Sequence, residues 1–239
     1  MKNLLLVFAL TAFTFSFGQI NKGRQMIGCN FSFSKAKSNS FDSTGTKPLV
    51  EEISTRAGFG LRYGYFIKDK IMLGVSASIN TGNTHSETVH YSGYFSIGGS
   101  YSQSLHIGIF SRYYQMLGKS KFAGFAHLGV NYNEGESRTT YIYSNGNYRG
   151  NNKHSGLSVF LGAGITYFLN KNIAIETYLG SIGFTNFKTT SYSENIKASQ
   201  STSLTFTSNT IFSFSSLNIG INFYFGGKKK ETETATPTP

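Results

Sequence analysis

Eight stretches of the chain alternate apolar residues with small or polar ones, which is the two-residue period of a β-strand with two unlike faces. In the last stretch, Leu217, Ile219 and Ile221 alternate with Asn218 and Gly220. No Lys, Arg, Asp or Glu falls on any of the eight apolar faces. A charge facing the middle of a bilayer costs about 2–4 kcal/mol, so the pattern favours strands that face lipid. The stretches are 27–34, 53–65, 71–80, 105–114, 122–132, 157–167, 173–180 and 216–225.

Short and long connections alternate between these stretches. Three short polar turns lie at 67–70, 117–120 and 169–172, and the other four connections run to about 18–26 residues. Membrane barrels place short turns in the periplasm and long loops outside. The sequence therefore predicts an all-β fold, an eight-stranded antiparallel up-and-down transmembrane β-barrel. Both mature termini are expected in the periplasm, and four long loops outside.

The N-terminus has the features of a secretory signal peptide: a lysine, then an apolar run from Leu4 to Phe17 that is too short to span a bilayer. Small residues at Ser16 and Gly18 favour cleavage between Gly18 and Gln19. No run of eighteen apolar residues follows, so membrane insertion would require strands. The predicted domains are a signal peptide at 1–18, a barrel at 19–225 and a disordered periplasmic tail at 226–239.

A soluble eight-stranded barrel of the lipocalin type is the architectural alternative. It would bury the apolar face and expose the other face, which here is rich in Gly, Ser and Asn with occasional Arg. Such a face is a poor exterior for eight strands. A charge-free face with aromatic residues near one end suits lipid better, so the membrane barrel is the favoured interpretation.

The chain resembles the eight-stranded outer-membrane β-barrel family of Gram-negative bacteria across nearly all of 19–225. The resemblance rests on the signal peptide, the strand count, the alternating connections and a last strand that ends in Phe223 and Phe225. It implies that this aromatic strand is recognised by the outer-membrane assembly machinery. Here a tail follows Phe225, so recognition would have to tolerate an extension.

The tail and the short turns hold much of the formal net charge of +11. Lys228, Lys229 and Lys230 precede a run of Glu, Thr and Pro, a composition that predicts disorder. The tail is a solvated spacer in one interpretation and a weak contact with the anionic cell-wall polymer in the other. The basic rim suits lipid phosphates, and neither a basic stripe nor a motif indicates nucleic acid.

Charged residues on the small, polar faces form the candidate site. Arg62, Arg112 and Glu176 should occupy one layer near the periplasmic end of the lumen, where a barrel of eight strands has room only for side chains. We expect Glu176 to pair with at least one arginine, because buried charges need partners. This inward-facing polar cluster, structural or gating in role, comprises Arg62, Arg112, Glu176, Arg56, His106 and His127.

Neither catalysis nor a metal site is predicted. His85 and Glu87 would share a strand face but His90 would not, and a loop imposes no fixed ligand geometry. No nucleophile elbow or linked carboxylate supports a hydrolase triad. We expect a non-enzymatic protein without cofactors.

The predicted function is that of an integral outer-membrane barrel with a lumen filled by side chains and a structural or surface-interaction role through its four loops. The alternative is a narrow porin-like conduit for small solutes or ions. The expected partners are outer-membrane lipids, the assembly machinery and an extracellular ligand or surface partner of the loops.

Overall fold

The computed structural model describes residues 20–41, 48–89, 95–118, 120–143, 146–193, 196–210 and 216–227. Within these residues, no helix is long and apolar enough to cross a membrane. The described strands are β1 (Arg24–Phe41), β2 (Pro48–Lys68), β3 (Ile71–Val89), β4 (Phe95–Met116), β5 (Phe122–Tyr143), β6 (Gly146–Phe168), β7 (Ile173–Ser193), β8 (Ile196–Thr210) and β9 (Ser216–Gly226).

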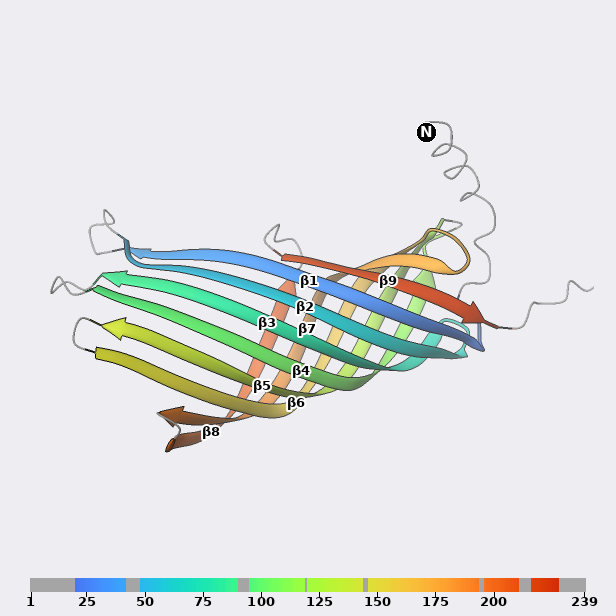
Figure 1. The fold of residues 1–239 in the computed structure, drawn as a ribbon. Helices are drawn as coiled ribbons and strands as arrows, with labels where there is room; N and C mark the ends of the chain where they lie inside the picture. The colour runs from blue at the N-terminus through green and yellow to red at the C-terminus, as the bar shows by residue number, and fades with distance from the viewer. Residues whose placement is uncertain are drawn as a thin grey trace, which may run out of the picture.

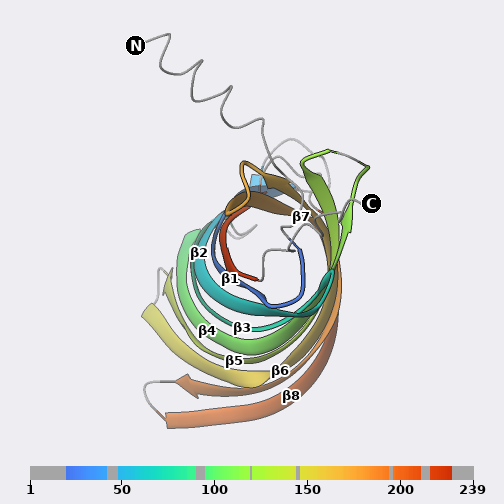
Figure 2. The same cartoon turned by 90° about the vertical axis from the view of Figure 1, so that its right-hand side faces the viewer.

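The strands form an antiparallel barrel in chain order (Figures 1 and 2). Strands β1 to β7 each pair with the next. Strand β9 closes the ring by pairing with β1 over Arg24 to Ser34 and with β7 over Ile173 to Glu176. Strand β8 pairs with β7 over Gly180 to Ser193, so β8 and β9 together fill the place of an eighth strand. The predicted eight-stranded up-and-down barrel is confirmed.

At the end of the barrel opposite the short turns, the wall has a gap between β1 and β8. Beyond Ser34, β1 pairs only with β2, and β8 pairs only with β7. No pairing joins β1 to β8 within the described residues. Figure 1 shows β9 lying beside β1, whereas β8 runs away from β1. The ring is therefore complete only toward the three short turns.

The prediction of four long loops is wrong, because the strands continue into those segments. Strands β5 and β6 stay paired up to Tyr143 and Gly146, and β3 and β4 stay paired up to Val89 and Phe95. Both faces of these extensions lack lipid, so their sequence lacks the apolar alternation that marks a strand in lipid. The sequence predicts β8 as part of a loop, because its apolar alternation is short and consists of Leu204 and Phe206 between threonines.

Large apolar side chains cover the outside of the barrel. Ile109 is 64% exposed and Leu157 is 59% exposed. On β1 the outer face stays uncharged over the nine residues from Gln25 to Phe33, and Lys35 follows. A tilted strand needs about 9–11 residues to cross a bilayer, so this apolar band has the height of a membrane. The strands continue beyond it.

The buried apolar residues gather inside the lumen near the short turns. Phe66 packs with its ring centre 5.7 Å from that of Tyr114 and 6.3 Å from that of Tyr224. We call this group the turn-side core: Ile20, Met26, Phe66, Met72, Phe110, Tyr114, Ala123, Phe125, Phe168, Ala174 and Tyr224.

Candidate functional site

A buried carboxylate lies between two arginines inside the barrel. Glu176 Oε1 lies 2.5 Å from Arg62 Nη2, and Glu176 Oε2 lies 2.8 Å from Arg112 Nη1. Asn222 donates a further hydrogen bond to Oε2 at 2.5 Å. The side chains of Arg62, Arg112 and Glu176 are 5%, 0% and 1% exposed. The contact expected from the sequence is present, and it involves both arginines.

Arg112 is the most fully bonded member of this group. Its Nε donates to His127 Nδ1 at 2.7 Å. Its Nη1 donates to Glu176 Oε2 at 2.8 Å and to the Tyr114 hydroxyl at 3.3 Å, and its Nη2 donates to Glu176 Oε1 at 3.2 Å and to the Tyr178 hydroxyl at 2.6 Å. A guanidinium has five N–H donors, so none is left for solvent. We call Arg62, Arg112, His127, Glu176, Tyr178 and Asn222 the ionic layer.

Aromatic rings enclose the ionic layer. The Arg112 Cζ lies 4.5 Å from the centre of the Phe125 ring, which is a cation–π distance. The His127 ring stacks between Phe110 and Phe160, with centre-to-centre distances of 5.2 Å and 5.0 Å. Aromatic rings therefore pack against Arg112 and His127, in addition to the hydrogen bonds that these side chains form.

Glycines on the inner face make room for these side chains. A Cβ on Gly220 would lie 2.7 Å from Glu176 Cγ and 2.9 Å from Arg62 Nη2. A Cβ on Gly129 would lie 2.4 Å from the Phe160 ring. Real Cβ contacts are not this short. The small residues that suggested a polar face in the sequence thus leave space for large side chains from neighbouring strands.

The N-terminal segment closes the same end of the lumen. The Lys70 N–H donates to the Ile20 carbonyl at 2.8 Å, and Lys22 N–H donates to Asp69 Oδ1 at 2.8 Å. Arg24 Nη1 donates to the Lys171 carbonyl at 3.0 Å. These bonds tie the segment to two of the short turns. The ionic layer, the turn-side core and this segment together form a plug.

Arg56 and His106 do not belong to the ionic layer. Arg56 lies six residues from Arg62 on β2, which is about 20 Å along a strand. His106 instead contacts Asn133 Oδ1 at 2.5 Å through Nδ1 and the Ser104 hydroxyl at 3.0 Å through Nε2. His127 does join the layer, as described above. The six predicted cluster residues thus separate into two levels.

An open hollow, which we call the vestibule, lies at the second level. Its volume is about 780 Å³, and Arg56, Asn80, His106 and Phe160 are among its lining residues. The vestibule departs from the expectation of a lumen that side chains fill along its whole length. Burial, with His106 nearby, lowers the pKa of the neighbouring His154. Among the described residues that line the vestibule, Arg56 is the only Lys, Arg, Asp or Glu.

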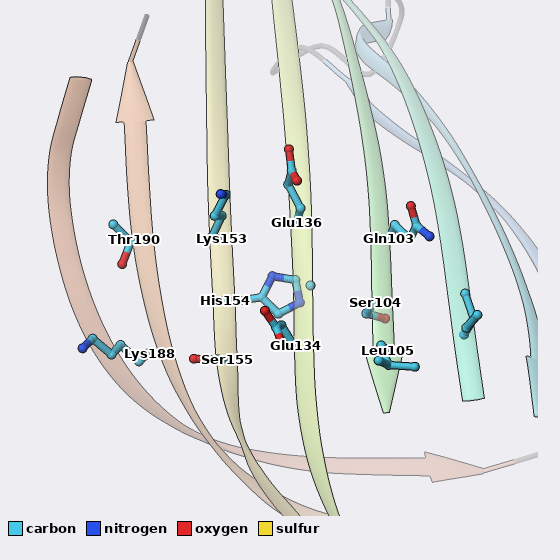
Figure 3. Close-up of a pocket in the computed structure, with 12 residues that line it drawn as sticks. Gln103, Ser104, Leu105, Glu134, Glu136, Lys153, His154, Ser155, Lys188 and Thr190 are labelled. Carbon is cyan, nitrogen blue, oxygen red and sulfur yellow. The ribbon is translucent and has the colours of Figure 1, made fainter. Parts of the chain in front are cut away.

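A second hollow of about 640 Å³ is lined by β3 to β7 (Figure 3). By strand alternation, Glu134, Glu136, Lys153 and Lys188 share the outer face with the apolar band, beyond its edge. Arg138 Nε donates to Glu136 at 2.7 Å, and this bond lowers the pKa of Glu136. The hollow mixes both signs of charge, so it selects for neither anions nor cations.

Other predicted positions lie apart from the lumen. Phe223 and Phe225 point outward from β9 and are 48% and 39% exposed. His85 Nε2 lies 3.3 Å from Glu87 Oε1 on the surface, and His90 falls outside the described residues. Nowhere in the described ranges do three His, Cys, Asp or Glu side chains group as metal ligands. The cleavage site at Gly18 and Gln19 and the tail lysines also fall outside those ranges.

The sequence analysis missed the aromatic and amide partners of the ionic layer. What marks these partners in the sequence is a large side chain, near a short turn, on a strand face that otherwise carries small residues. The missed residues are Phe110, Tyr114, Phe125, Phe160, Tyr178, Asn222 and Tyr224.

No protein-family model and no curated protein matches the sequence. Solved outer-membrane barrels match over most of the chain. The outer membrane protein OprG from Pseudomonas aeruginosa is 18% identical, with 87% of this chain and 98% of OprG covered and a TM-score of 0.44. Neisserial surface protein A is 12% identical (85% and 98% covered, TM-score 0.37), and Ail from Yersinia pestis is 15% identical (85% and 99% covered, TM-score 0.35). This similarity concerns the fold alone.

Proposed function

We propose that the protein is an integral outer-membrane barrel that is sealed toward the periplasm and presents its open end to the outside. Its role is structural or surface-interacting rather than enzymatic. The observation that carries the proposal is the plug, in which charged and aromatic side chains fill the lumen over two successive layers. A lumen closed in this way favours a surface role over a conduit.

The outer surface supports the membrane location. The apolar band is free of charge and has the height of a bilayer, and lipid accepts only closed sheets or helices. Basic residues at the short turns, including Lys68, Lys70 and Lys171, suit the phosphates of the inner leaflet. This arrangement supports an orientation with the short turns and both mature termini in the periplasm. The paired extensions beyond the band then project outside, where they offer hydroxyl-rich surfaces to a partner.

Single-channel conductance of the refolded barrel in a planar bilayer tests the proposal. We expect a silent wild type, because the buried side chains of the plug fill the lumen at the end near the short turns. A variant that truncates both layers, with Arg62, Arg112, Glu176, Phe66 and Tyr114 changed to Ala, should conduct and so show that the assay detects an opening. Heat-modifiable migration on a gel verifies folding of each protein. Steady wild-type conductance would replace the sealed barrel by the conduit.

A further inference from the structure

We propose that the vestibule is a binding site for a small polyhydroxylated anion, a solute that carries a phosphate, sulfate or carboxylate group. The proposal rests on the proposed function in one respect: the vestibule opens to the outside and ends at the plug. It names a ligand class for the open end of the barrel.

Arg56 supplies the charge that such a ligand needs. Its side chain lies across a glycine of the next strand, where a Cβ on Gly82 would lie 3.5 Å from Arg56 Cγ. Within the described residues, its guanidinium forms no ion pair and no hydrogen bond with another side chain. The planar guanidinium binds phosphate or carboxylate through two parallel hydrogen bonds.

No carboxylate lines the vestibule in the part of the chain that the structure describes. Glu52 is on the same face of β2 as Arg56, but four residues further out, which is about 13 Å along the strand. The carboxylate of Glu176 is buried within the ionic layer, where Arg62, Arg112 and Asn222 contact it. An anion in the vestibule therefore meets Arg56 without a competing acid on the wall.

Hydroxyl and amide groups line the vestibule together with Arg56. Ser32 and Asn80 converge from two strands over Gly58, where a Cβ would lie 2.5 Å from Ser32 Oγ and 2.2 Å from Asn80 Oδ1. Ser102 lies beyond Gly82 and donates to its carbonyl at 3.4 Å. These groups donate and accept hydrogen bonds as sugar hydroxyls require.

The size of the vestibule indicates a solute larger than a bare ion. A volume of about 780 Å³ is within the range of about 300–1,000 Å³ that small-molecule sites occupy. Phe160 and Tyr178 contribute apolar surface toward the plug, while the polar groups lie toward the opening. A sugar phosphate or a sugar acid would match both the charge and the hydroxyl lining.

Isothermal titration of the full refolded barrel in a nonionic maltoside detergent tests the proposal, with glucose 6-phosphate and glucose as matched probes. We expect wild type to bind the phosphate and to bind glucose at least about tenfold more weakly, since a hydrogen-bonded charge is lost. Arg56→Gln should weaken phosphate binding by a similar factor. Arg138→Gln, which removes an exterior arginine paired with Glu136, should leave it unchanged.

Three results would overturn the anion site: no wild-type binding of the phosphate at millimolar concentration, equal binding of both probes, or unchanged binding by Arg56→Gln. Competition by phosphatidylglycerol in the micelle would support the same anion chemistry and assign the site to a lipid headgroup. If phosphatidylglycerol does not compete, the site is assigned to a free solute.

Conductance is measured separately. A barrel that conducts and also binds the phosphate would refute only the proposal that the plug seals the lumen. A silent barrel that does not bind the phosphate would refute only the anion site.

Discussion

Replacing Glu176 by glutamine should destabilise the barrel more than any other single change in the ionic layer. The substitution keeps the shape but leaves Arg62 and Arg112 buried at 5% and 0% exposure without a counter-charge. Removing one partner of a buried ion pair costs about 3–5 kcal/mol. Arg62→Met should cost only about 1–2 kcal/mol, because Arg112 and Glu176 remain as a balanced pair joined by two hydrogen bonds.

The free energy of unfolding can be measured by urea titration in lipid vesicles, followed by tyrosine fluorescence, since the chain has 15 Tyr and no Trp. The double variant Glu176→Gln with Arg112→Met supplies the control. It leaves one buried charge instead of two, so it should be more stable than the sum of the two single losses predicts. If Glu176→Gln proved no more destabilising than Arg62→Met, the carboxylate would not be what holds the two arginines in place.

Two further predictions concern the wall of the barrel. Gly220→Ala should destabilise the barrel by about 1–3 kcal/mol, because the new methyl group would meet Glu176 and Arg62 in a packed layer. Urea titration measures this loss of stability. A loss below about 0.5 kcal/mol would contradict the prediction. Ile109→Arg, at the middle of the apolar band, should lower the free energy of unfolding by about 2–4 kcal/mol. Gln103→Arg, on the same face but beyond the band, should lower it little. Equal losses of stability for the two variants in lipid vesicles would contradict a membrane boundary between these positions.

The sequence predicted the part of the fold that lies in lipid. There the solvent differs between the two faces of each strand, so residues such as Ile219 and Gly220 must alternate in character. The three short turns were also predicted, since polar residues at 67–70, 117–120 and 169–172 interrupt that alternation. Beyond the membrane both faces lose contact with lipid, and the paired extensions give no periodic signal. In β8 the alternation is limited to Leu204 and Phe206 between threonines, which is too short to predict a strand.

The candidate site was predicted only where charge marks it. Arg62, Arg112 and Glu176 stand out on a face of Gly, Ser and Asn, and their spacing from the strand ends places them at one level. Arg56 was placed in the same cluster because its inward direction follows from alternation, whereas its height depends on the register between strands. Register is set by the whole pairing pattern and not by one strand.

The plug and the vestibule follow from the same inner face, which changes in side-chain volume along the barrel axis. Near the short turns a glycine on one strand faces a large side chain on the next, as Gly129 faces Phe160, and the lumen fills. Around the vestibule glycine faces short polar side chains, as Gly82 faces Ser102 and Gly58 faces Asn80, and the lumen stays open. The glycines therefore make room at both levels: at the plugged end for large aromatic rings, and beside the vestibule for shorter polar side chains that leave a hollow between them. The two ends can then change independently, because truncating the plug alters passage through the barrel while changing Arg56 alters what the open end retains.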